Sequence, residues 1–313
     1  MSTCGCVTSL RYGAPMRTIL VDRPIDLLAS LSPLVSSHRD PTIRLRHDRV
    51  VRASRTPDGP ATLDVRRVGE RRFEATAVGP GRDRALEGAP DLLGAEDDLA
   101  GFAPQLDPTV ARAHHLHPGL RLIRSGQVED LLVPTILAQR VTGREAGRAW
   151  TRIVQAWGAP APGSSGLRLP PTCAQLAARP YWEFHHLGVE RSRARRIAVA
   201  CRELAASNGF RHPADATTYA RLLRIPGVGP WTAALVARST AGDPDAVEVG
   251  DFHVKNHITF ALTGDARGSD DRMLELLAPF AGHRGRVVRL LTSVVRRPPA
   301  FGPRRRVVPV DAL

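Results

Sequence analysis

The segment at residues 222–229, Leu-Leu-Arg-Ile-Pro-Gly-Val-Gly, constrains the fold more than any other part of this 313-residue chain. Apolar residues at helical spacing predict a helix over 217–224. The proline of the segment ends this helix, and its two glycines allow positive φ and the close approach of another backbone. A second helix is predicted over 232–239, with Pro230 in a favourable first position. The segment therefore predicts a hairpin of two short helices over 217–240.

Such a turn leaves backbone N–H groups unpaired at the start of the second helix, where a phosphate can bind. A hairpin that holds no ligand is the alternative, because short glycine patterns often match by chance. A single carboxylate follows the hairpin. Asp251 stands in the run Val-Glu-Val-Gly-Asp-Phe-His-Val-Lys-Asn at 247–256. It can act as a catalytic group on the molecule whose phosphate binds the turn, or it can cap the next helix without a catalytic role.

Turn and acid together resemble the helix-hairpin-helix DNA glycosylases of the HhH-GPD superfamily. The matching residues are Leu222, Ile225, Pro226, Gly227, Val228, Gly229, Thr232, Ala233 and Asp251. Within that superfamily, Gly-Pro-Trp-Thr-Ala at 229–233 and Asp-Phe-His-Val-Lys at 251–255 are most similar to the AlkA-type 3-methyladenine DNA glycosylases, also termed type II. The resemblance implies that the partner is double-stranded DNA containing damaged bases and that Asp251 is the catalytic carboxylate.

The chemistry of that class fits one carboxylate. Cleavage of an N-glycosidic bond passes through a cationic, oxocarbenium-like sugar, which a fixed anion stabilises while it orients or deprotonates the attacking water. An alkylated purine already carries positive charge, so its departure does not require a second, acidic carboxyl group. The base must first be rotated out of the duplex into a pocket. We therefore expect an N-glycosyl hydrolase of base-excision repair that acts on alkylated, cationic purines.

Lysine usage separates two mechanisms within this resemblance. Glycosylases that also nick DNA carry a lysine in the helix after the hairpin, and this chain has Trp231 near that place. Lys255 is the only lysine in the sequence, and we expect it to neighbour Asp251 or to contact a phosphate. A monofunctional glycosylase is therefore the favoured hypothesis. The alternatives are a bifunctional glycosylase/lyase acting on oxidised bases and a non-catalytic DNA-binding protein that has kept the hairpin.

The resemblance also assigns a base pocket and a DNA surface. Aromatic faces attract a cationic base, and the expected pocket residues are Trp231, Phe252, Leu235 and His283. The two aromatics could instead be core residues, and the histidine a surface residue. The run Ile-Leu-Ala-Gln-Arg-Val-Thr at 136–142 is similar to the family segment that enters the minor groove. By this resemblance, Gln139 fills the gap left by the extruded base, and Arg140 inserts into the groove beside it. The alternative is that Arg140 is an ordinary exposed arginine. The expected DNA-binding residues are Gln139, Arg140, Pro226, Gly227, Val228, Gly229, Thr232 and Lys255.

No cofactor is required by this chemistry. The resemblance allows a structural Na⁺ or K⁺ at the hairpin, held by the backbone carbonyls of Leu223, Ile225 and Val228. The four cysteines stand at positions 4, 6, 173 and 201, whereas iron–sulfur members of the superfamily carry four clustered cysteines near the C-terminus. An iron–sulfur cluster of that kind is therefore not expected. The His-His-Leu-His run at 114–117 lacks metal-ligand spacing and predicts a polar helix end between domains.

The charge of the chain agrees with a nucleic-acid partner. It has 44 basic against 31 acidic residues and a formal net charge of +13, which favours binding to a polyanion. The arginines at 191–196 are nevertheless expected to form a solvated helix face rather than specific contacts. The sequence shows neither a membrane-length apolar run nor the apolar stretch of a signal peptide. We therefore expect a monomeric cytoplasmic protein that makes no membrane contact and joins the nucleoid when bound to DNA.

Four regions are expected along the chain. Residues 1–15 are expected to be a disordered tail, and Met16 could be the true start. Short alternating runs over 16–104 predict a small α+β domain with an antiparallel sheet, similar to the TBP-like N-terminal domain of the AlkA type. Helical periodicity over 105–295 predicts a mainly α, two-part glycosylase domain. Residues 296–313 are expected to form a basic flexible tail that adds nonspecific phosphate affinity.

Overall fold

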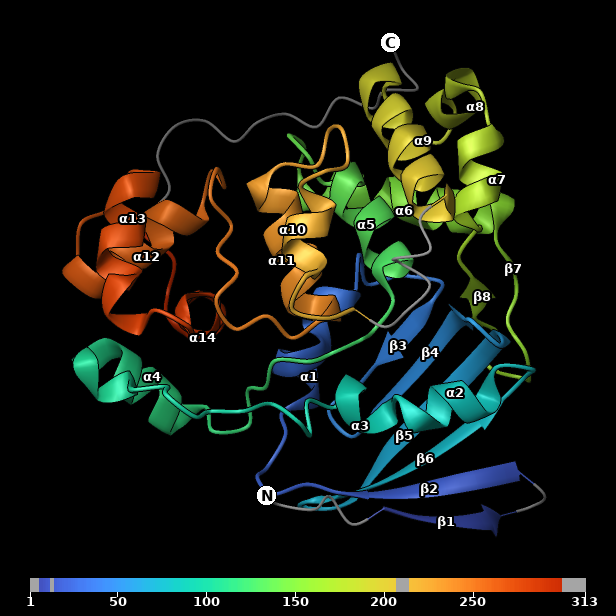
Figure 1. Ribbon diagram of the computed structural model, residues 1–313, viewed down its shortest axis with the longest axis horizontal. Coiled ribbons are helices and arrows are strands. Elements are labelled where there is room, and N and C mark those ends of the chain that lie inside the picture. The colour runs from blue at the N-terminus through green and yellow to red at the C-terminus, as the bar shows by residue number, and fades with distance from the viewer. Residues whose placement is uncertain (1–5, 12–13, 207–213, 300–313) are drawn as a thin grey trace.

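The N-terminal part of the computed structural model is a six-stranded antiparallel sheet in the order β1-β2-β6-β5-β4-β3 (Figure 1). The structure describes residues 6–11, 14–206 and 214–299. Alternation along the strands buries Leu63, Val65 and Phe73 on one face, which three short helices cover. The strands are β1 (Cys6–Arg11), β2 (Ala14–Leu20), β3 (Ile43–Leu45), β4 (Arg49–Thr56), β5 (Gly59–Gly69) and β6 (Arg72–Val78), and the helices are α1 (Leu27–Leu31), α2 (Arg82–Glu87) and α3 (Ala89–Leu92).

The sheet begins earlier in the chain than the sequence pattern predicts. β1 pairs with β2 from Cys6 opposite Ile19 to Arg11 opposite Ala14, so residues 6–11 and 14–15 of the expected disordered tail lie in strands. This pairing satisfies backbone groups of β2 that would otherwise form an open sheet edge. The prediction of disorder is therefore corrected for these residues. Residues 1–5 and 12–13 of that tail, and 300–313 of the expected basic tail, lie outside the described residues.

Beyond the sheet, the described residues form helices joined by loops, together with one two-stranded ribbon, β7 (Ala159–Pro160) paired with β8 (Arg168–Leu169). The prediction of a mainly α region behind a small α+β region is confirmed. No helix among the described residues is long and apolar enough to span a membrane. The helices are α4 (Pro108–Leu116), α5 (Val128–Leu137), α6 (Gly143–Trp157), α7 (Cys173–Ala178), α8 (Tyr181–His185), α9 (Arg191–Ala206), α10 (Thr218–Leu222), α11 (Pro230–Thr240), α12 (Val254–Thr263), α13 (Asp270–Leu277) and α14 (Arg284–Val294).

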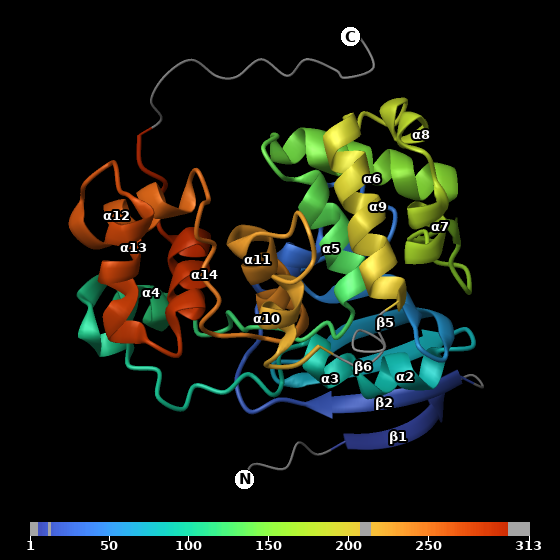
Figure 2. The same cartoon turned by 45° about the horizontal axis from the view of Figure 1, so that its top comes forward.

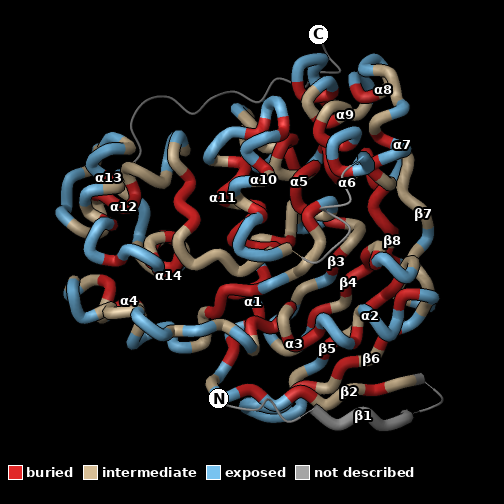
Figure 3. The backbone as a smooth tube through the Cα atoms, viewed as in Figure 1, coloured by how far each residue is buried: buried red, intermediate tan, exposed pale blue. Residues whose placement is uncertain are grey.

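Two hydrophobic cores divide these helices. One core joins the sheet to α5–α11 through residues such as Leu132 and Ile197, and the other joins α4 to α12–α14 through residues such as Val110 and Met273. Figure 3 shows buried residues (red) in the strands and in the helices of both groups. The loop after α11 runs from the first core to the second, which places the run at 247–256 at their junction (Figures 1 and 2).

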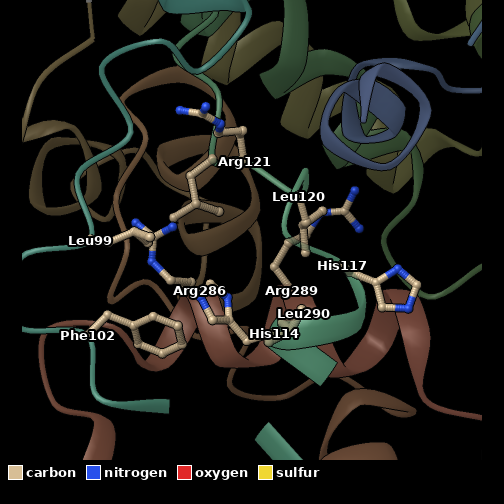
Figure 4. A pocket seen from close by; sticks show the side chains of 10 residues that line it. Leu99, Phe102, His114, His117, Leu120, Arg121, Arg286, Arg289 and Leu290 are labelled. Carbon is tan, nitrogen blue, oxygen red and sulfur yellow. The ribbon is translucent and has the colours of Figure 1, made fainter. Parts of the chain in front are cut away.

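A cavity of about 10 Å³ lies where α4 meets α14 (Figure 4). A cavity of this size holds about one water molecule. The guanidinium groups of Arg121 and Arg286 line it, but they are bonded to Asp22 and Asp97. None of the lining residues belongs to the run at 247–256. The cavity is therefore separate from that run, and the histidine run at its edge forms the end of α4, as predicted.

Acidification is expected to destabilise the fold through His114, which lines this cavity. Burial, followed by the positive charges of Arg23, Arg286 and His115, lowers the pKa of His114 below its ordinary value. The unfolded chain therefore binds this proton at a higher pH than the folded protein. The contribution of neutral His114 to the free energy of unfolding is complete above the pKa of the unfolded state, about 6.5. This contribution is lost as the pH falls through the pKa of the folded state. Urea unfolding at about pH 7.5 and about pH 5.5 should show a smaller acid-induced loss for His114→Gln than for the wild type. Equal losses would contradict this assignment.

Candidate functional site

Asp251 lies in the loop before α12, and three hydrogen bonds fix its carboxylate. Oδ1 accepts the backbone N–H groups of His253 and Val254 at 2.6 and 2.8 Å. Oδ2 accepts the indole N–H of Trp231 on α11 at 2.7 Å. Asp251 therefore caps α12, and it also bridges to the hairpin helix. The three hydrogen bonds come from two different elements, so they fix the orientation of the carboxylate.

The chain just before Asp251 is anchored by two ion pairs. Glu248 accepts both terminal nitrogens of Arg238 on α11, and both side chains are buried. Asp245 likewise accepts the guanidinium and backbone N–H of Arg284 at the start of α14. The Asp251 N–H then donates to the Glu248 carbonyl at 3.1 Å. The position of the carboxylate thus depends on contacts with helices from both cores.

Asp270, at the start of α13, anchors the same loop from a third helix. Its carboxylate accepts the Gly250 N–H at 2.9 Å and the Lys255 ammonium at 3.0 Å. Burial acts to raise the pKa of Asp270, but these hydrogen bonds and the charge of Lys255 outweigh it and lower the pKa. The structure therefore gives Lys255 a partner other than the expected Asp251 or phosphate. Sequence reasoning missed Asp270, because an acidic first turn indicates a helix start and nothing more.

The expected pocket residues separate into two places. Trp231 and Leu235 lie one turn apart on α11 and are half-buried. Phe252 is 72% exposed, and its ring meets that of His253 edge-on with centroids 5.0 Å apart. Phe252 is therefore not a core aromatic, and it presents an exposed ring directly after the carboxylate. These three residues adjoin Asp251 in the sequence or lie on the helix that contacts it.

His283 is placed differently from its expected role in the pocket. It is buried, its Nε2 bonds to the Ala100 carbonyl at 2.9 Å, and its Nδ1 accepts from Arg286 Nε at 3.1 Å. Its ring also lies 5.4 Å from that of Phe102. Both ring nitrogens are thus used in packing α14 against the segment before α4. We therefore correct the prediction that His283 lines a base pocket.

Gln139, directly after α5, connects three elements. Its Nε2 donates to the Gly227 carbonyl at 3.1 Å and to Thr232 Oγ1 at 3.0 Å, and its Oε1 accepts from Arg196 of α9 at 3.2 Å. Gly227 has φ +86°, and a Cβ there would lie 3.0 Å from Arg196 Cγ. The left-handed backbone therefore favours glycine at this position, and a side chain there would also crowd Arg196. Sequence reasoning missed Arg196, because the helix-face pattern gave no sign of a contact with the turn.

Arg140 follows in a strained conformation. It is exposed, and among the described residues it is the one non-glycine residue with positive φ, at +60°. Left-handed backbone costs an L-residue about 1–2 kcal/mol, and such strain is typical of functional positions.

Replacing this residue with glycine should relieve that strain. We expect Arg140→Gly to raise the free energy of unfolding by about 0.5–1 kcal/mol, the relief being partly offset by glycine's unfolded-state entropy. Urea denaturation measures the change. Arg140→Ala, which keeps the strain, is the control and should not be more stable than the wild type; equal gains for both variants would contradict the assignment of strain.

The hairpin turn offers unpaired groups of both signs. α11 begins at Pro230 with no side-chain cap, and a Cβ added at Gly229 would meet nothing within 4 Å. The N–H groups of Trp231 and Thr232 therefore have no side-chain cap, and the start of this helix can bind an anion. Among the described residues, no hydrogen bond reaches the carbonyls of Leu223 and Val228, while that of Ile225 accepts the Val228 N–H at 3.0 Å. These oxygens are the donor type that a monovalent cation requires.

The sequence similarity to known proteins centres on this region. Residues 133–278 match the family described as "HhH-GPD superfamily base excision DNA repair protein". Two curated relatives come from Mycobacterium tuberculosis strains CDC 1551 / Oshkosh and H37Rv, and both are named "Probable bifunctional transcriptional activator/DNA repair enzyme AlkA". Each is 33% identical over 162 residues, which make up 50% of this chain and 31% of the relative. The chain thus matches about a third of the length of these relatives.

Similar solved structures cover nearly the whole fold. The "3-methyladenine dna-glycosylase from Archaeoglobus fulgidus" has a TM-score of 0.73 at 16% identity, covering 88% of this chain and 97% of that chain. The apo form of Clostridium acetobutylicum 8-oxoguanine glycosylase/lyase has a TM-score of 0.67 at 12% identity, with coverage of 92% and 98%. At these identities the likeness establishes a shared fold, including the N-terminal sheet.

Proposed function

Because residues 133–278 of this chain belong to the HhH-GPD superfamily of base excision DNA repair proteins, we propose that the protein is a monofunctional DNA glycosylase. Its proposed substrates are alkylated, cationic purines in double-stranded DNA, which it hydrolyses at the N-glycosidic bond after base flipping, acting as a monomer. AlkA-type sequence similarity supports the alkylpurine class. The shared fold alone is compatible with either an alkylpurine or an oxidised base.

The observation that carries the proposal is the fixed Asp251 carboxylate beside exposed aromatic surface. Hydrogen bonds from Trp231 and from the start of α12 hold both carboxylate oxygens. A preorganised anion of this kind stabilises an oxocarbenium-like sugar without reorientation during the reaction, and it can orient the attacking water. The exposed ring of Phe252 offers a face to a cationic base, worth about 0.5–2 kcal/mol.

The single lysine of the chain and its position support hydrolysis over lyase chemistry. A lyase needs an uncharged amine to form a Schiff base with the sugar. Lys255 is the only lysine of the chain, and its ammonium is bound to Asp270 rather than directed to Asp251. Trp231 stands in α11 near the position where glycosylases that also nick DNA carry a lysine. These two observations support hydrolysis over the bifunctional alternative.

The hairpin and the end of α5 are the proposed DNA surface. The open first turn of α11 would bind a backbone phosphate, and the free carbonyls of the turn would hold Na⁺ or K⁺, which would help to neutralise that phosphate. Arg140 would insert into the minor groove, and Gln139 would leave its contacts with Gly227 and Thr232 to fill the gap behind the extruded base. No further cofactor is proposed.

Base release from defined DNA tests the proposed function. Duplexes containing methylated purines, hypoxanthine or 8-oxoguanine are incubated with the protein, and free bases are separated by chromatography. Methylated purines should be released, and borohydride should trap no protein–DNA adduct. Release of no base from any duplex would remove the enzyme proposal. A trapped adduct that disappears in Lys255→Met would replace it with a lyase.

A charge at the turn should weaken DNA binding without harming the fold. Gly229 has φ −96°, which any residue adopts, and open space at its Cβ, so aspartate fits as a helix cap. We expect Gly229→Asp to reduce affinity for duplex DNA by about tenfold or more, because the anion repels the phosphate. Gly229→Asn is the matched neutral cap. Equal affinities of the two variants, measured by anisotropy, would count against a phosphate site here.

A further inference from the structure

Two aromatic side chains lie exposed side by side on α8. Trp182 is 60% exposed and Tyr181 37%, and their rings meet edge-to-face with centroids 5.5 Å apart. Exposed aromatic surface of this kind is characteristic of interaction sites, since burial of such rings normally stabilises a protein. Figure 2 shows α8 at the outer end of the helical part, next to α9 and away from α12–α14.

Two arginines at the start of α9 extend this surface. The guanidinium carbons of Arg191 and Arg195 lie 4.6 and 5.9 Å from the centre of the Tyr181 ring. Both residues are exposed, and neither forms an ion pair with a described carboxylate. Arg193 on the same helix is different, because it is buried and donates to the Leu137 carbonyl. Arg191 and Arg195 therefore hold positive charge next to aromatic faces, with the charge available to a partner.

We propose that Tyr181, Trp182, Arg191 and Arg195, termed the α8–α9 platform, bind single-stranded nucleic acid. Aromatic faces stack on unpaired bases whatever their identity, and arginines bind the phosphates between them. Bases within a duplex are covered by their neighbours and offer no free face to a side chain. The combination of an exposed tryptophan with unneutralised cations thus fits a single strand better than a duplex.

The platform is separate from the site proposed for catalysis. None of its four residues hydrogen-bonds to the hairpin turn or to the loop that carries Asp251, among the contacts of the described residues. Its binding therefore does not depend on Asp251 or on a damaged base. The inference goes beyond the proposed function and can fail or hold independently of it.

Fluorescence anisotropy with a labelled thymidine homopolymer of about 16 nucleotides tests the platform. We expect Trp182→Ala to weaken binding by about 5- to 150-fold and Trp182→Phe, which keeps an aromatic face, to have a much smaller effect. The double variant Arg191→Ala/Arg195→Ala should lower the slope of log affinity against log salt by about 1.4. Leu106→Ala, at a leucine that is 57% exposed elsewhere, is the control and should bind as the wild type does.

The same series in a Gly229→Asp background removes any contribution of the hairpin. Far-UV circular dichroism establishes that each variant is folded, as the exposure of Trp182 leads us to expect. Unchanged oligonucleotide affinity in both Trp182→Ala and the double arginine variant would overturn the proposal and leave the surface to a protein partner. A parallel loss of methylpurine release from duplex DNA would also overturn it, because the platform would then belong to the duplex site.

Discussion

Asp251→Asn is expected to slow the release of methylated purines by about 10²–10⁴-fold, measured under single-turnover conditions. The substitution removes the negative charge that the proposed transition state requires. It also places an amide where Oδ2 now accepts the indole N–H of Trp231, so one orienting hydrogen bond is lost or the amide must turn. Affinity for duplex DNA should change little, because the phosphate contacts are assigned to the hairpin and to the end of α5.

Asp265→Asn is the matched control for that experiment. Asp265 is an exposed aspartate beyond the end of α12, and its substitution makes the same change in charge and size. It should release methylated purines at the wild-type rate. If Asp251→Asn also retained that rate, the carboxylate would be left with its capping role alone.

Arg238→Met is expected to lower the free energy of unfolding by about 3–5 kcal/mol. The side chains of Arg238 and Glu248 are each only 6% exposed, and the substitution leaves the Glu248 carboxylate buried without its counter-ion. Burial acts to lower the pKa of Arg238, but the charge and hydrogen bonds of Glu248 outweigh it and raise the pKa. Urea denaturation followed by circular dichroism gives the change directly.

The double variant Arg238→Met/Glu248→Leu separates the ion pair from the packing around it. Removing both charges should recover most of the lost stability, because a buried pair can often be replaced by apolar residues at little cost. Base release should stay below the wild-type rate, since Glu248 no longer fixes the loop that positions Asp251. A double variant as unstable as the single one would show that the destabilisation does not come from an unpaired charge.

The local parts of the site could be predicted from sequence, because their conformation depends on residues that are close together in the chain. The hairpin follows from two prolines and two glycines between apolar periods, and α10 and α11 confirm it. The sheet follows in the same way from alternation, except for β1, whose pairing with β2 depends on an edge that no short run of sequence reveals.

The long-range parts could not be predicted, because each depends on the path of the chain between distant residues. Gln139 meets Gly227 across 88 positions, and nothing near either residue indicates that contact. His283 was assigned by its alignment with the family, but its partner Ala100 lies 183 positions away and decides where the ring goes. Asp270 and Arg196 were missed for the same reason.

The two hydrophobic cores are expected to form at different times during synthesis of the chain. α4 leaves the ribosome before α5–α11, yet its buried residues Val110 and Ala113 share a core with α12–α14, which are made after α5–α11. The sheet and α5–α11 can form their shared core before α12–α14 have been synthesised, since domains generally fold as units from the N-terminus. The loop that carries Asp251 therefore reaches its final position only after α14 has been made, because Arg284 of that helix holds Asp245.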